Sequence, residues 1–86
     1  MNESAGQRRG AVSLVFEGAR LHYEDGSDEA LLRGDQLYAE GLARLAELGD
    51  MGTIARLADV ISRVAQAHAE EDPGAAAAAW REVGIE

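Results

Sequence analysis

Apolar residues recur every three or four positions along most of the chain, which is the spacing of amphipathic helices. The first such segment places Val12, Val15 and Phe16 on one face and predicts a helix over residues 10–23. The start of this segment also alternates as a strand would, but the helical spacing continues past Gly18 for two more turns. Glycine costs a helix about 1 kcal/mol relative to alanine, so we expect Gly18 to mark a close helix crossing.

A turn-forming cluster at residues 24–28, with a glycine at its centre, precedes a second helix expected over 28–48. This helix has two apolar stripes, one of Leu31, Tyr38, Leu42 and Leu45 and the other of Leu37, Gly41 and Leu48. Gly34 and Gly41 lie seven positions apart on one side of the helix. We expect them to let another backbone approach closely.

A third helix is expected over residues 51–69, where an uninterrupted apolar stripe includes Ile54 and Ile61. Its short connection to the second helix suggests an antiparallel αα-hairpin. After a Pro-Gly break, residues 75–83 predict a short helix anchored by Trp80. The expected fold is all-α: an antiparallel three-helix unit within residues 9–72, a flexible tail over 1–8, and a short C-terminal helix within 73–86.

Composition narrows the possible functions of this 86-residue chain. It contains no cysteine, which excludes disulfides and zinc–thiolate sites, and its net charge of −8 disfavours nucleic-acid binding. All eight basic residues are arginine, so no Schiff-base lysine exists. No apolar run approaches the roughly 20 residues of a membrane span. We expect a cytoplasmic protein.

The residues that could carry chemistry do not assemble into a recognisable site. His68 precedes acidic residues 70–72, but neighbouring residues on a helix point in different directions and cannot converge on a metal. His22 also lies on an apolar stripe, and no serine has the context of a nucleophile. The sequence therefore predicts no catalytic residue, no metal ligand and no cofactor site.

Residues 31–50, which include Gly34-Asp35 and end in Leu45-Ala46-Glu47-Leu48-Gly49-Asp50, resemble a segment of the trans-polyprenyl diphosphate synthases. Residues 53–61 resemble the helix that follows in that family, and residues 11–25 more loosely resemble the preceding one. Within the family, the chain is most similar to the small non-catalytic component of two-subunit heptaprenyl and hexaprenyl diphosphate synthases.

The resemblance implies an accessory subunit rather than an enzyme, because the family's aspartate-rich metal motifs have no counterpart here. The helix that would carry the first motif reads Phe16-Glu17-Gly18-Ala19-Arg20-Leu21-His22, with a single acid. From the match, Asp35 receives only a structural role. The expected partner is a catalytic synthase subunit in isoprenoid (quinone side-chain) synthesis; the alternative is a small helical homo-oligomer that serves as an interaction or regulatory module.

For either association, the candidate interface residues are Leu37, Gly41, Leu48, Ile54, Ile61 and Trp80. We expect a bulky residue at position 41 to dissociate the complex while leaving helicity largely unchanged.

Overall fold

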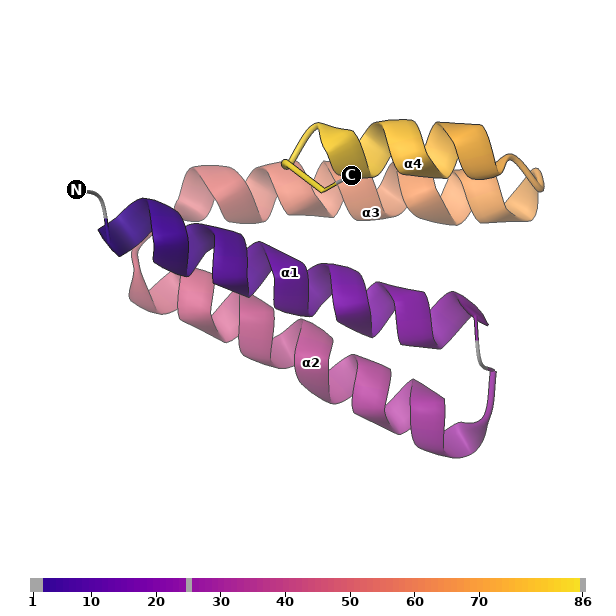
Figure 1. Ribbon diagram of the computed structural model, residues 1–86, viewed down its shortest axis with the longest axis horizontal. Coiled ribbons are helices and arrows are strands. Elements are labelled where there is room, and N and C mark those ends of the chain that lie inside the picture. The colour runs from indigo at the N-terminus through magenta and orange to yellow at the C-terminus, as the bar shows by residue number, and fades with distance from the viewer. Residues whose placement is uncertain (1–2, 25, 86) are drawn as a thin grey trace. The chain divides into compact units, whose positions relative to one another are not determined.

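The computed structural model describes residues 3–24 and 26–85. These residues form four helices joined by short turns, with no strand among them. They are α1 (Glu3–Glu24), α2 (Asp28–Glu47), α3 (Met51–Ala69) and α4 (Pro73–Arg81). The predicted all-α class is confirmed. The helices form two compact units, Met1–Asp50 and Met51–Glu86, in which α1 packs on α2 and α3 packs on α4 (Figure 1).

Helices α2 and α3 begin where the sequence predicts and end within a residue of it. The start of α1 differs, because the helix begins at Glu3 rather than at residue 10. Residues 3–8, expected to belong to a flexible tail over 1–8, are thus part of α1; residues 1 and 2 lie outside the described residues. Good helix formers such as Ala5 and Gln7 extend α1 without an apolar pattern. Arg8 also bonds to Asp50, 42 residues away.

Residues 28–48 belong to the first unit and residues 51–69 to the second. Their expected packing against each other therefore stays a prediction.

Glycines bring the α1 and α2 backbones into direct contact. A Cβ atom added to Gly18 would lie 2.5 Å from the Gly34 carbonyl oxygen, and one added to Gly34 would lie 2.7 Å from that of Gly18. A Cβ atom on Gly41 would meet the Ala11 carbonyl oxygen and Val15 Cγ2, each at 2.6 Å. The close approach expected at all three glycines is confirmed, and the order of these contacts makes the pair antiparallel.

The buried residues of both helices follow these contacts. On α1, Ala11, Val12, Val15 and Gly18 are buried. On α2 the buried residues are Ala30, Gly34, Leu37, Gly41 and Leu45. They recur at the spacing of one helical face, so Gly34 and Gly41 lie at the centre of the packed side of α2.

Three helix ends share one hydrogen-bond pattern. After α2, the Gly49 and Asp50 amides donate to the carbonyls of Ala46 and Leu45; corresponding pairs of bonds follow α3 and α4. This is the Schellman motif, in which the residue beyond the helix is left-handed. Gly49, Glu71 and Gly84 occupy that position, with φ of 72°, 55° and 86°. Glu71 is the one non-glycine residue among the three.

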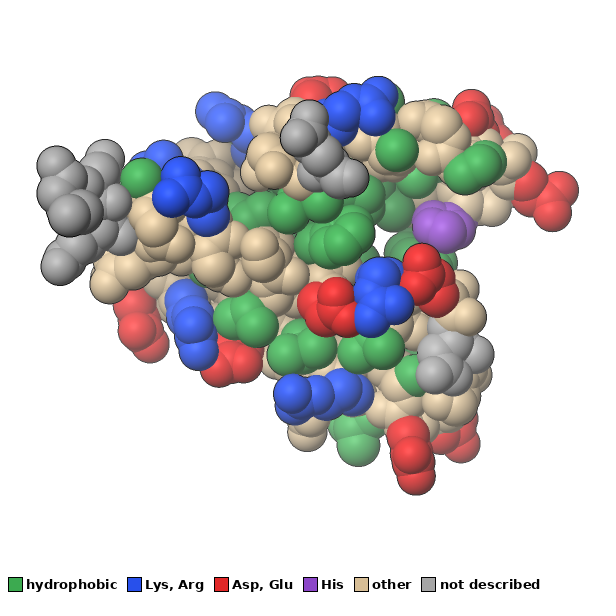
Figure 2. Space-filling model, viewed as in Figure 1, with side chains coloured by type: hydrophobic (Ala, Val, Ile, Leu, Met, Phe, Trp, Pro, Cys, Tyr) green, Lys and Arg blue, Asp and Glu red, His purple; other side chains and the backbone are tan. Residues whose placement is uncertain are grey.

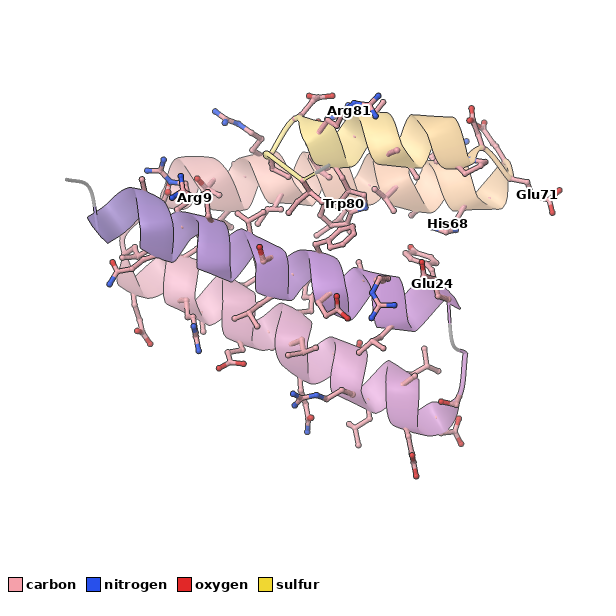
Figure 3. The ribbon with its side chains drawn as sticks, viewed as in Figure 1. Arg9, Glu24, His68, Glu71, Trp80 and Arg81 are labelled. Carbon is pink, nitrogen blue, oxygen red and sulfur yellow. The ribbon has the colours of Figure 1, made fainter. Side chains whose placement is uncertain are left out.

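The second unit pairs α3 with a much shorter helix. The buried residues of α3 are Thr53, Leu57, Val60, Val64 and Ala67, and those of α4 are Ala79 and Trp80. The Asp72 carboxylate caps α4 by accepting a 3.1 Å hydrogen bond from the Ala75 amide. Arg63 links the two helices by bonding to Glu82. Trp80 and Arg81 point to opposite sides of α4, so only one of them is buried (Figure 3).

Replacing Gly18 with alanine is expected to destabilise the chain, because the new methyl group meets backbone atoms that cannot move aside. Overpacking of this kind costs about 1–3 kcal/mol. The matched control is Gly10→Ala, since Gly10 lies on the same helix with nothing within 4 Å of its added Cβ. That change is expected to stabilise by about 0.5–1 kcal/mol. Urea unfolding followed by far-UV circular dichroism measures both, and equal stability of the two variants would contradict the glycine contact.

Glu71→Gly is expected to stabilise the α3–α4 connection, because a left-handed conformation costs an L-residue roughly 1–2 kcal/mol. The neighbouring Glu70 has no positive φ, so Glu70→Gly is expected to destabilise by about 1 kcal/mol through glycine's greater backbone entropy. The difference in unfolding free energy between these two variants is the measurement. A Glu71→Gly variant that is the less stable of the two would show that residue 71 is unstrained.

Candidate interaction surface

The structure places the six candidate interface residues in two groups. Leu37, Gly41 and Trp80 are buried, whereas Leu48, Ile54 and Ile61 are half-buried. Gly41 contacts Ala11 and Val15 within the chain. A bulky side chain at position 41 would therefore separate α1 from α2. A variant of this kind does not test association alone, because it also disrupts the packing within the chain.

Beside the glycine contacts, the α1–α2 pair has an apolar side that we call the aromatic flank, half-buried except for the exposed Tyr23. Its residues are Phe16 and Tyr23 on α1 and Leu31, Tyr38 and Leu42 on α2. Helical spacing puts the α1 members on one side of that helix and the α2 members on one side of theirs. Tyr23 on α1 is near enough to Tyr38 on α2 to raise the pKa of the Tyr38 phenol.

Burial raises the pKa of the Tyr38 phenol, and nearby Tyr23 raises it further. Both effects disfavour the phenolate, because a charge is poorly solvated at a half-buried position and a second negative charge would repel it. Tyr38 is therefore a neutral hydrogen-bonding group throughout the physiological pH range.

Charged side chains of both signs are interspersed over the face drawn in Figure 2. Several form ion pairs within one helix: Arg20 bonds to Glu17 and Glu24, and Arg44 bonds to Glu40 at 2.9 Å. The hydrogen bond to Arg20 lowers the pKa of Glu17. Such exposed pairs contribute little stability.

The histidines and acids do not assemble into a metal site. No group of three or more His, Asp or Glu residues in the described part of the chain is placed to hold a metal ion. His22 Nδ1 lies 4.0 Å from an Asp35 carboxylate oxygen, and both side chains are at least half exposed. His68 and Glu71 project near the turn between α3 and α4, where they line a shallow pocket with Asp72 and Pro73 (Figure 3).

Asp35 differs from the structural role that the resemblance gave it. Its side chain is 75% exposed, and His22 at 4.0 Å is a weak electrostatic contact. Gly34 beside it is buried against α1. Of the Gly-Asp pair, the glycine has the structural role.

Large apolar side chains that remain exposed are another candidate for contact with a partner. Leu32 on α2 is 62% exposed, Met51 at the start of α3 is 64% exposed and Tyr23 is 39% exposed. The expected interface residues do not include these three side chains. Leu32 lies outside both apolar stripes of α2, and an isolated leucine among polar residues is the sequence feature that could have identified it as an exposed apolar residue.

Comparison with protein families, with characterised proteins and with solved structures finds no match to this chain. The likeness of residues 31–69 to prenyl synthases therefore stays a prediction. No helix among the described residues has the length and apolar character needed to cross a membrane.

The raised pKa of Tyr38 predicts a pH-dependent loss of stability at the alkaline end. The folded chain holds this phenolic proton more tightly than the unfolded chain does, so stability falls as pH rises from about 10 through the raised value. In a Tyr23→Phe variant, Tyr38 is the one tyrosine left. Its ultraviolet phenolate absorbance is expected to appear above pH 10 in the folded chain and near pH 10 in denaturant. Identical titration curves in the two states would show that Tyr38 is fully solvated.

Proposed function

We propose that this protein is a non-catalytic, prenyl-synthase-like small subunit that pairs with a catalytic polyprenyl diphosphate synthase in the cytoplasm. It would support isoprenoid (quinone side-chain) synthesis without carrying out the reaction. The observation that carries the proposal is the resemblance of residues 31–61, which includes Gly34-Asp35, in a sequence without aspartate-rich metal motifs.

The packing of the matched segment supports the proposal. Residues 31–47 form most of one continuous helix, α2, and residues 53–61 lie on the next helix, as the resemblance implies. The looser match over residues 11–25 corresponds to most of α1, which pairs with α2. The order of helices is thus the order that the resemblance requires.

Exposed groups on α2 supply the surface for a partner. Asp35 and Leu32 both lie in the matched segment, and the side chains of both are mostly exposed. Full burial of the exposed Leu32 side chain by a partner would contribute about 1.5–3 kcal/mol.

The alternative is a homo-oligomeric interaction module with no synthase partner. The exposure of Leu32 and Met51 favours this reading equally, because apolar surface can be covered by a second copy as well as by another protein. The two proposals differ in what is bound.

Co-expression with the long-chain polyprenyl diphosphate synthase encoded in the same genome tests the proposal. We expect the two chains to elute as one complex in size-exclusion chromatography with light scattering. We also expect prenyl transfer from isopentenyl diphosphate to require both chains and to be absent with the small chain alone. A synthase that is fully active and unbound without this chain would refute the proposal, and self-association without the synthase would support the alternative.

Leu32→Glu is expected to weaken that complex by roughly tenfold or more, because it puts a charge where an apolar side chain is covered. Gln36→Glu is the matched control, since residue 36 is also exposed and lies one turn along the same helix. It adds the same charge without removing an apolar group. Equal affinities of the two variants would exclude Leu32 from the interface.

A further inference from the structure

Helix α4 is the least independently stable element of the chain. It has nine residues, and isolated helices shorter than about 12–15 residues are marginal in water. Five consecutive alanines make up most of it. Alanine favours the helix but offers little apolar area, so α4 depends on its packing against α3.

That packing rests on few side chains. Ala79 and Trp80 are the buried residues of α4, and Trp80 is the one with a large apolar area. Ala75, Ala77 and Ala78 are exposed. By contrast, α1 and α2 touch through their backbones at Gly18, Gly34 and Gly41, along much of their length. Removing α4 from α3 breaks far fewer contacts than separating α1 from α2.

The polar connections between α4 and α3 are also weak. The Arg63–Glu82 pair has side chains 41% and 53% exposed, and water and salt screen such pairs. The Asp72 cap stabilises the helix itself and does not hold it on α3. Trp80 is therefore the one large apolar side chain that α4 buries.

The antiparallel register identifies what α4 covers. Ala67 and Ala76 line the same pocket, and Arg63 bonds to Glu82. Between these two points, Trp80 lies level with Val64. Val64 and Ala67, which lie opposite α4 in this register, are each 2% exposed in the closed arrangement.

We infer that α4 is a detachable strap, which opens away from α3 while the long helices remain folded and uncovers the apolar residues Val64 and Ala67. The strap is a conformational device of this chain alone and does not depend on pairing with a synthase. Opening of this kind is local unfolding, which has a lower free energy than unfolding of the whole chain.

Trp80 makes the opening directly measurable because it is the only tryptophan in the chain. In a urea titration of the full chain, we expect the Trp80 fluorescence transition to precede the loss of helicity seen by far-UV circular dichroism. Amide hydrogen exchange is expected to be at least about tenfold faster for residues 76–82 than for residues 57–67. Coincident transitions together with equal exchange protection would overturn the inference.

Glu82→Gln sharpens the test because it removes the cross-helix pair without altering the apolar contacts. It is expected to move the fluorescence transition to lower urea while the circular dichroism transition stays in place. Glu40→Gln is the control, since it removes an exposed pair with Arg44 inside α2. A Glu82→Gln variant whose two transitions move together would show that α4 unfolds only with the whole chain, and would refute the strap.

Discussion

Backbone contact between α1 and α2 is the constraint on which the first helical pair depends. The carbonyl oxygens of Gly18 and Gly34 each occupy the space where the other residue's Cβ would lie. This contact fixes the rotation of both helices about their own axes, because each must turn its glycine toward the other. Once that rotation is set, it determines which way the other side chains of α1 and α2 face. These include the aromatic flank with Tyr38 and the outward-facing Leu32.

Most of the elements could be predicted from the sequence, because their signals are local. The turn around Gly26, the cap at Ser27 and the glycine at position 49 define α2 within one residue. The start of α1 could not be predicted in this way. Residues 3–9 form a helix through propensity without an apolar stripe, and Arg8 bonds to Asp50 from 42 positions away. Such a distant pair leaves no periodic signal in the sequence.

The candidate interface was harder to predict, because α2 has two apolar stripes and periodicity does not rank them. The stripe with Leu37 and Gly41 looked available for a partner, yet glycine's small size commits that stripe to α1. Trp80 was expected to anchor its short helix and was also a candidate interface residue, and in the structure it is buried. In each case the competition between intrachain and interchain partners is decided by packing that only the three-dimensional structure contains.

The packing of α1 on α2 also explains part of the sequence segment that resembles the prenyl synthases. A glycine at position 34 is required by the α1–α2 contact alone, so any helical pair packed this closely would have one whatever its function. Asp35 has no such explanation, since its side chain is 75% exposed and makes one weak contact with His22. The fold does not need a carboxylate there. Packing thus accounts for the glycine of the Gly-Asp pair and leaves the aspartate as a solvated residue of the helix surface.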